Sequence, residues 1–171
     1  MSQKQIDIAR SKSLANGFNI DFIKSDIKDL DLKQKFDVVT AGFVFSYAPI
    51  CTELKDYLRV AYNHLKTDGR LFSVVCNPLN PLRESGVLYR VSLADGSPLK
   101  NGSKLCCEFF DRDGKFLCYD YKFFWDRTSI EDSAIKTGFN RLFWIDIKNR
   151  ETSTDDVPKL KSTNAIFYAR K

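Results

Sequence analysis

The residues best suited to bind a polar ligand follow two apolar segments in the first third of the chain. Asp26 ends the segment 18–26 (FNIDFIKSD), in which apolar and polar residues alternate as in a strand. Ala41 and Gly42 interrupt the apolar run 36–48 (FDVVTAGFVFSYA). A carboxylate at the carboxyl end of a strand can accept hydrogen bonds from a ligand, and small residues there let a ligand approach the backbone. This pattern predicts a binding crevice at the carboxyl edge of a sheet.

Each of these residues also has a structural interpretation. Asp26 could be a solvated loop residue or could cap the turn that follows it. Ala41 and Gly42 could be small because a helix packs closely over them. Three aromatic residues after the small pair could wall a pocket, but such residues more often belong to the core: Phe43, Phe45 and Tyr47. Of these three, only the tyrosine has a hydroxyl that could contact a ligand.

Acid–base, nucleophilic and metal chemistry have little support in the sequence. The single histidine, His64, lies near the end of a predicted helix, where interaction with the helix dipole or with solvent explains it. No G-x-S-x-G, Walker or H-E-x-x-H motif occurs. The cysteines are odd in number and lack metal-ligand spacing, which indicates buried free thiols in a reducing compartment: Cys51, Cys76, Cys106, Cys107 and Cys118.

A strand–helix–strand unit positions the predicted crevice. The run 36–48 is too apolar to alternate, as expected of a strand covered on both faces. Apolar residues recur at helical spacing over 52–65, and Asp68-Gly69 then turns the chain into an apolar strand over 70–76. An earlier helix is predicted from a capping box at Ser2 to a stop at Asn16-Gly17. This order predicts a parallel sheet with helices on both faces and ligands at its carboxyl ends.

The second half of the chain has a different pattern. Segment 77–103 is rich in proline and glycine and is predicted to be a long loop with a short helix near 82–87. Aromatic runs within 105–125 flank Asp113-Gly114, which predicts a hairpin. A second capping box, at 128–131, predicts a helix that stops at Gly138. Two final strands are predicted over 141–148 and 164–171.

In this order, the segments resemble a class I S-adenosylmethionine-dependent methyltransferase of the small-molecule type, related to the ubiquinone-biosynthesis enzymes. The resemblance covers nearly the whole chain. The matching segments, in the order of the family's elements, are the helix after the second strand (S-x-x-x-I-x-x-A-R, 2–10), the third strand (IDFIKSDI, 20–27), the fourth (36–48), the "L-K-x-G-G-x-L" turn with the fifth (65–75), a late helix (128–139) and the antiparallel last strand (164–171).

The resemblance implies site residues and a cofactor. It implies that the Asp26 carboxylate accepts the adenine amine of S-adenosylmethionine and that the Ile27 backbone N–H meets a ring nitrogen. It places Ala41, Gly42 and Tyr47 beside the methionine portion and the methyl-donor pocket. If 77–127 folds over the site as a lid, four of its residues could line the pocket of a small-molecule acceptor: Tyr89, Asp120, Tyr121 and Trp125.

The chain also departs from the family pattern. In the family, a first strand, a Gly-rich turn and a second strand ending in an acid precede the helix that starts here at Ser2. We therefore expect an N-terminally truncated fold that lacks the first two strands, whose activity by itself is in doubt. The alternatives are a non-catalytic remnant or partner-binding fragment, and a nucleotide-cofactor oxidoreductase. The oxidoreductase would end in parallel βα units, whereas the methyltransferase ends in an antiparallel strand.

Composition bounds the class of protein. The 171 residues suit one domain over 1–171, with 77–127 as an insertion, and hydrophobic and charged contents of 43% and 29% are ordinary for a globular protein. No apolar run is long enough to cross a membrane, so we expect a soluble, cytoplasmic protein. The net charge of +5 comes from dispersed residues and does not favour a nucleic-acid partner.

Overall fold

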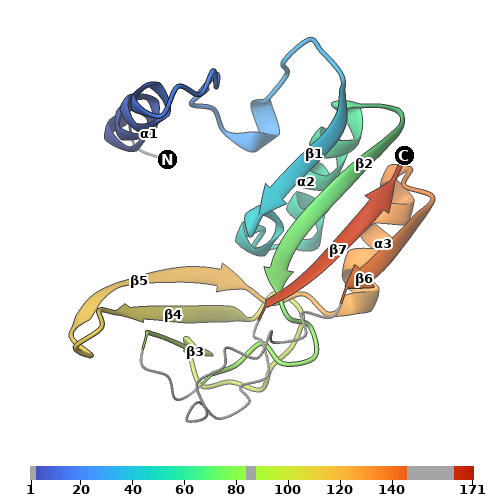
Figure 1. Cartoon of the computed structure of the whole chain (residues 1–171). Coiled ribbons are helices and arrows are strands. Elements are labelled where there is room, and N and C mark those ends of the chain that lie inside the picture. Colours follow the sequence, from blue (N-terminus) through green and yellow to red (C-terminus); the bar gives the residue numbers. More distant parts are fainter. Residues whose placement is uncertain (1–2, 84–87, 146–163) are drawn as a thin grey trace. The chain divides into compact units, whose positions relative to one another are not determined.

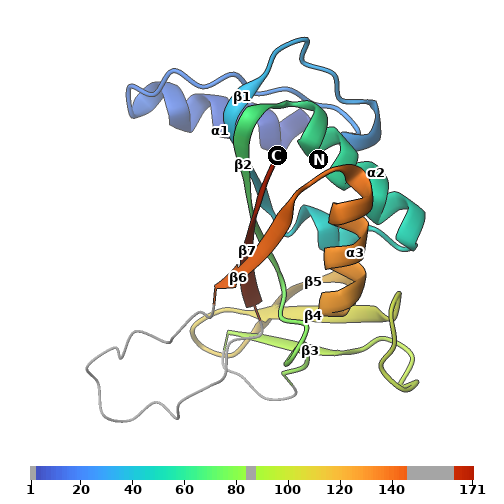
Figure 2. The same cartoon turned by 90° about the vertical axis from the view of Figure 1, so that its right-hand side faces the viewer.

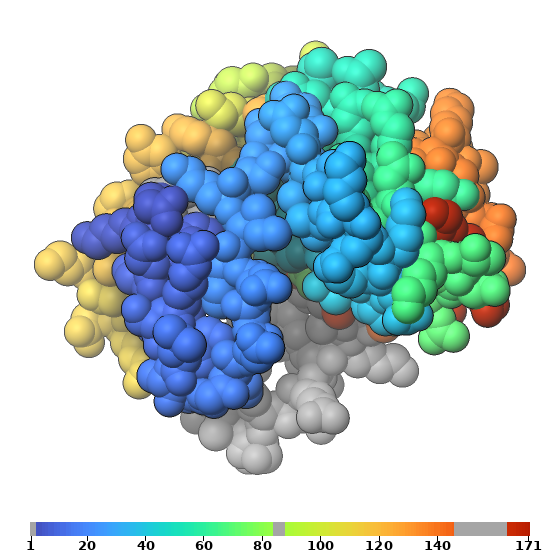
Figure 3. Space-filling view, turned by 90° about the horizontal axis from the view of Figure 1, so that it is seen from above, coloured from blue at the N-terminus to red at the C-terminus, as the bar shows by residue number. Residues whose placement is uncertain are grey.

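The computed structural model describes residues 3–83, 88–145 and 164–171, which fall into two units, Met1–Asp31 and Leu32–Lys171. The first unit contains helix α1 (Gln3–Ala15), seen as dark-blue atoms in Figure 3, and a short 3₁₀ helix η1 (Ile27–Asp29). As predicted, α1 stops before Gly17, which has a left-handed φ of 69°. Ser2, the predicted cap of this helix, lies outside the described residues.

The predicted strand over 18–26 is wrong, because these residues form no strand. Strand-like alternation is a local pattern, but a strand also needs a neighbour for its backbone N–H and C=O groups. Here the side chains of α1 bond two of the backbone oxygens: Arg10 donates to Phe22 at 2.8 Å and Ser13 to Phe18 at 3.0 Å. Apolar residues of the segment remain exposed, Phe18 by 61%.

The main sheet of the second unit has the order β1-β2-β7-β6 (Figure 1). Its strands are β1 (Phe36–Gly42), β2 (Leu65–Cys76), β6 (Arg141–Ile145) and β7 (Asn164–Arg170). β1 and β2 are parallel, as the strand–helix–strand pattern predicted. β7 lies between β2 and β6 and runs antiparallel to both, which confirms the predicted antiparallel last strand. Residues 146–148 of the last but one predicted strand lie outside the described residues.

Helices α2 (Cys51–Asn63) and α3 (Arg127–Thr137) pack against each other and cover the same face of this sheet (Figure 2). The apolar face of α2 is the one that the helical spacing predicted. Helix, sheet and the turn after β1 share one core, whose fully buried side chains include Phe45, Leu54, Leu58, Leu71, Val75 and Phe167. None of the described helices is long and apolar enough to cross a membrane.

A second, antiparallel sheet has the order β3-β4-β5 and lies at the carboxyl ends of β1 and β2 (Figure 1). It consists of β3 (Tyr89–Leu93), β4 (Lys104–Phe110) and β5 (Phe116–Phe123). The predicted hairpin is confirmed, with Gly114 in the left-handed region at φ 78°. β3 falls inside the predicted long loop, and residues 84–87 of the short helix predicted there lie outside the described residues.

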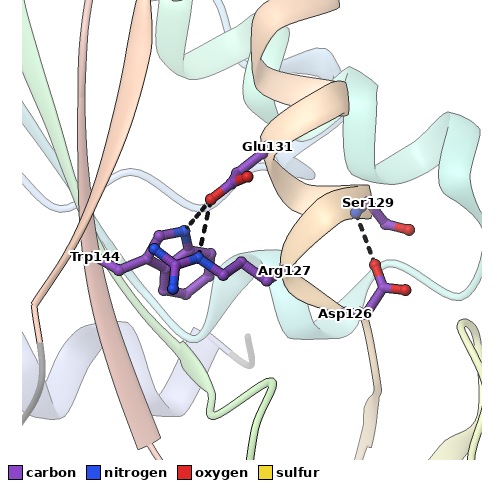
Figure 4. Close-up of polar contacts among 5 residues, drawn as sticks. All are labelled: Asp126, Arg127, Ser129, Glu131 and Trp144. Atoms are coloured by element: carbon purple, nitrogen blue, oxygen red, sulfur yellow. Dashed lines mark hydrogen bonds and ion pairs between the residues drawn. The ribbon is translucent and has the colours of Figure 1, made fainter.

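Helix α3 begins differently from the prediction (Figure 4). The N-cap is Asp126, whose Oδ1 accepts a 2.7 Å hydrogen bond from the Ser129 backbone N–H, so the capping box predicted at 128–131 is wrong. The acid of that box, Glu131, instead accepts a 2.7 Å hydrogen bond from Trp144 Nε1 of β6 and pairs with Arg127 Nε at 3.0 Å. Glu131 therefore ties α3 to the main sheet. The predicted stop is confirmed at Gly138.

Candidate functional site

The carboxyl end of β1 leaves open space above the backbone. Ala41 is buried, and its C=O accepts a 3.0 Å hydrogen bond from Ser73 Oγ of β2. A Cβ atom added to Gly42 would meet nothing within 4 Å. Phe43 then adopts a left-handed φ of 60° and donates its N–H to Val74 O at 2.8 Å, which turns the chain sharply. A ligand can thus reach the backbone at Gly42, as the cofactor suggested by the sequence would require.

The three aromatic residues after β1 separate into core and surface. Phe45 is buried and stacks on Phe167 of β7, with 6.0 Å between ring centroids, so it belongs to the core. Tyr47 is 44% exposed, and its hydroxyl donates a hydrogen bond to Asp120 Oδ2 of β5. The Phe43 ring is half-buried and lies against the ammonium of Lys122 on β5. Only two of the three rings therefore border the surface where a ligand could bind.

The small sheet brings a face that is apolar on β3 and β4 and carries Asp120 and Lys122 on β5 to this point. Asp120 pairs in register with Cys107 of β4, which pairs with Val91 of β3, so these residues share one face. Six residues gather where this face meets the carboxyl ends of β1 and β2, and we call them the junction cluster: Phe43, Tyr47, Cys76, Cys107, Asp120 and Lys122. They come from β2, β4, β5 and the turn after β1.

The junction cluster contains protonated groups around one carboxylate. Burial, followed by the hydrogen bond and charge of Asp120, raises the pKa of Tyr47 above its usual value. Burial raises the pKa of Cys107 to about 11, against a smaller opposing effect of Lys122, and burial also raises the pKa of Cys76. Both thiols are therefore neutral near pH 7 and poor nucleophiles. Asp120 and Lys122 are the charged members of the cluster.

The other predicted acceptor-side residues lie apart from Asp120. Tyr121 is on the opposite face of β5, since side chains alternate along a strand, and Lys104 Nζ lies 3.8 Å from its ring centroid. Tyr89 shares the face of Asp120 but packs under Arg83, with 4.3 Å between the guanidinium carbon and the ring centroid. Of the predicted cofactor-side and acceptor-side residues, the structure thus brings Tyr47 and Asp120 together.

Trp125 has a structural contact. Its indole is buried, and Nε1 donates a 2.9 Å hydrogen bond to the backbone C=O of Ala48, just before α2. A small pocket next to it has room for about one water molecule, which is too little for a cofactor or an acceptor. Trp125 therefore holds the chain after β5 against the turn that carries Tyr47.

Asp26 and Ile27 belong to the first unit, at the start of η1. Asp26 Oδ1 accepts a 3.0 Å hydrogen bond from the Lys28 backbone N–H, so the capping role considered from the sequence is present. A carboxylate has a second oxygen that can accept from a ligand while the first one caps. The adenine-binding role of the two residues stays a prediction.

His64 has a structural role, as the sequence suggested. It is buried at the end of α2, where Nδ1 lies 2.8 Å from Val60 O and Nε2 accepts a 2.9 Å hydrogen bond from the Leu32 backbone N–H. Both ring nitrogens are therefore engaged by the backbone, and neither is free to move protons on a ligand.

Sequence reasoning missed Lys122 and the two buried thiols of the junction cluster. Lys122 could have been found, because it follows Asp120 by two residues in a predicted strand and must share its face. Cys76 and Cys107 come from different sheets, and no local pattern predicts that these strands meet.

Comparison with known proteins agrees with this architecture. Residues 1–69 match the family model described as a methyltransferase domain. An S-adenosylmethionine-dependent methyltransferase from Clostridium acetobutylicum superposes with a TM-score of 0.67 at 20% identity, covering 99% of this chain and 72% of that one. The CcbJ methyltransferase from Streptomyces caelestis superposes with a TM-score of 0.66 at 15% identity, covering 99% and 76%. The chain has the class I methyltransferase fold.

The fold expected from the resemblance to class I S-adenosylmethionine-dependent methyltransferases is thus confirmed, and the first 69 residues match a methyltransferase domain. The amino pentose methyltransferase CalS10 from Micromonospora echinaspora, solved with S-adenosylmethionine bound, has the same fold. Its TM-score is 0.53 at 14% identity, over 85% of this chain and 62% of that chain. A comparison with curated protein sequences found no match.

Proposed function

We propose that this methyltransferase-fold protein transfers a methyl group from S-adenosylmethionine to a small-molecule acceptor. The observation that carries the proposal is the open carboxyl end of β1 at Gly42, next to the hydrogen-bonded Tyr47 and Asp120. In open α/β sheets, ligands bind at the carboxyl ends of parallel strands. The small sheet supplies polar groups from a different part of the chain at the same edge, as a site for two ligands requires.

The residues of the chain have separate roles in this proposal. Asp26 and Ile27 bind the adenine end of the cofactor, and Gly42 leaves room for the methionine end. Bound S-adenosylmethionine supplies an electrophilic methyl carbon. The chain contributes alignment of the acceptor and exclusion of water, and a base is needed only for a nucleophile that must lose a proton. Asp120 is the half-buried acceptor-side carboxylate of the junction cluster.

Two further observations favour this function over its rivals. The antiparallel β7 is the ending expected of the methyltransferase and not of a nucleotide-cofactor oxidoreductase. Two structures with the same fold are named as the sugar N-methyltransferase KedS8 from Streptoalloteichus and the amino pentose methyltransferase CalS10. These names support a small molecule, rather than a macromolecule, as the acceptor of this chain.

Titration calorimetry with S-adenosylhomocysteine tests the proposal on the full chain. We expect saturable binding that the Gly42→Val substitution weakens by about tenfold or more, because the new side chain occupies ligand space and its Cβ would meet no protein atom within 4 Å. Valine also suits a strand, so the folded state should persist. No binding by a folded chain would refute the enzyme proposal and favour the non-catalytic alternative.

Asp26→Asn tests the adenine end. The asparagine oxygen can still cap η1, but its amide group offers donors to the adenine amine, so S-adenosylhomocysteine binding should weaken by about 1–3 kcal/mol. Asp29→Asn, a nearby exposed aspartate in the same turn, is the matched control and should leave the affinity unchanged. Equal affinities of the two variants would remove Asp26 from the site.

A further inference from the structure

We propose that Asp120 and the Phe43 ring form an ammonium-binding subsite, so that the acceptor is an amine methylated on nitrogen. The inference rests on the proposed function, because it names the acceptor class of the same site. It combines two contacts of the junction cluster: a carboxylate fixed by a tyrosine, and an aromatic ring that already holds a primary ammonium.

The ammonium already on the ring belongs to Lys122. Its Nζ lies 3.9 Å from the centroid of Phe43, well within the range of cation–π attraction. Lys122 is half-buried, on the same face of β5 as Asp120. The chain's own side chain thus shows that a primary ammonium fits against this ring, on the face of β5 that also carries Asp120. An acceptor ammonium would take the place of this flexible lysine head group.

The carboxylate of Asp120 is fixed before any acceptor arrives. Its Oδ2 accepts a hydrogen bond from the Tyr47 hydroxyl, and its Oδ1 accepts a 2.9 Å hydrogen bond from the Tyr121 backbone N–H. A carboxylate can accept about four hydrogen bonds, so acceptor capacity is left on both oxygens. Because the carboxylate is already held in one orientation, its side chain loses less conformational entropy when a donor binds.

The charges around Asp120 favour a cationic acceptor over a neutral or anionic one. Its buried neighbours Cys76 and Cys107 are neutral thiols, so within the junction cluster the positive charge near it is the Lys122 ammonium, which lies on the Phe43 ring. A half-buried carboxylate gains most from a cation that also donates hydrogen bonds. A hydroxyl donates one hydrogen bond and brings no charge, while a carboxylate or phosphate on the acceptor would be repelled by Asp120.

The same carboxylate can prepare the amine for methylation. A protonated amine has no free lone pair, so it must lose one proton before it can act as a nucleophile. In the subsite, the ammonium R–NH3+ transfers a proton to the carboxylate of Asp120, which leaves R–NH2 and a neutral carboxylic acid. The proton then passes from Asp120 to water at the exposed side of the cluster. The nitrogen keeps the electron pair that methyl transfer requires.

Two probes that differ in a single group test the subsite directly. Benzylamine carries an ammonium near pH 7, and benzyl alcohol replaces it with a hydroxyl. We expect benzylamine to shift the amide NMR signals of residues 120–122 in the full chain saturably, with an affinity at least about tenfold above that of benzyl alcohol. Similar affinities for the two probes, or no saturable shift with benzylamine, would overturn the inference.

Three substitutions assign the binding to the proposed residues. Asp120→Asn keeps an acceptor for Tyr47 but removes the charge, and should weaken benzylamine binding by about tenfold. Lys122→Met removes the competing ammonium and should strengthen it. Lys104→Met is the matched control, because Lys104 covers Tyr121 in the same way on the opposite face of β5. Binding that Asp120→Asn leaves intact, or that Lys104→Met changes equally, would also overturn the subsite.

Calorimetry with S-adenosylhomocysteine on the same samples separates this inference from the proposed function. Asp120→Asn should leave that affinity within about twofold of the unsubstituted chain. If S-adenosylhomocysteine binds but benzylamine is not preferred, the ammonium subsite is refuted and the methyltransferase proposal stands. If benzylamine is preferred but S-adenosylhomocysteine does not bind, the assignment of an amine acceptor falls together with the proposed function.

Discussion

Asp120 and Glu131 each accept a hydrogen bond from an aromatic side chain that lies on a different element of the fold. Asp120 on β5 accepts from the hydroxyl of Tyr47, at the carboxyl ends of β1 and β2. Glu131 on α3 accepts from the indole N–H of Trp144 on β6, at 2.7 Å (Figure 4). A cation lies near each carboxylate and covers an aromatic ring. The two sites use the same kinds of side chain.

The position of the cation distinguishes them. Arg127 lies over the ring of Trp144, 5.2 Å from its centroid, and also pairs with Glu131 at 3.0 Å, so its charge is engaged within the protein. Lys122 instead places its ammonium on Phe43. A planar, forked guanidinium can serve ring and carboxylate together, whereas an ammonium is a compact charge on a flexible stem. The Arg127 group therefore joins two elements, and the Lys122 group can be displaced by a ligand.

The largest expected effect is a difference in the free energy of unfolding when each of the two aromatic donors, Trp144 and Tyr47, is replaced by alanine. Trp144→Ala removes the hydrogen bond to Glu131 and the contact with the ring of Phe167, whose centroid is 5.3 Å away, and should cost about 2–4 kcal/mol. Tyr47→Ala removes a side chain that is 44% exposed and should cost about 1 kcal/mol or less. Urea unfolding followed by circular dichroism measures both. A larger loss for Tyr47→Ala would reverse the comparison.

A smaller effect is expected when each carboxylate loses only its charge. Glu131→Gln keeps an oxygen for Trp144 but ends the partly exposed ion pair with Arg127, and should lower the free energy of unfolding by about 0.5–1 kcal/mol. Asp120→Asn should lower the free energy of unfolding less, because no arginine in the described part of the chain pairs with Asp120. The same substitution should have a large effect on benzylamine binding. Salt titration is the control, since added salt should reduce the cost of Glu131→Gln.

The smallest effect concerns pH. The pKa of Tyr47 is raised in the folded protein, so folding favours the neutral phenol. Its contribution to stability is complete below the ordinary tyrosine pKa of about 10 and is lost as pH rises from there through the folded-state pKa. Tyr47→Phe should therefore flatten the fall in stability above about pH 10. Tyr119→Phe, an exposed tyrosine on β5, is the control, and identical profiles for the two variants would contradict the shift.

Local patterns predicted the elements that local contacts stabilise. The apolar spacing of α2 and the left-handed glycine in the β4–β5 hairpin are encoded within a few residues, and both are confirmed. Elements that depend on distant partners were harder to predict. Segment 18–26 alternates like a strand but has no strand beside it, and β3 lies in a proline- and glycine-rich stretch but pairs with β4.

The candidate site shows the same division. Tyr47 and Asp120 were both selected from the sequence, but as contacts of two different ligands, because 73 residues separate them. Their hydrogen bond depends on how the small sheet docks on the turn after β1, and neither segment contains that information alone. Trp125 was selected for its type, and the structure shows that its polar atom is used by the backbone of Ala48.

The indole of Trp125, bonded to the turn after β1, makes the two regions optically separable. The chain has two tryptophans, and the other, Trp144, belongs to the Glu131 network. Variants that keep one indole each would therefore emit from one region at a time. A shift in emission from Trp125 alone would report a ligand at the junction cluster, and a shift from Trp144 alone would report loosening of α3 from β6.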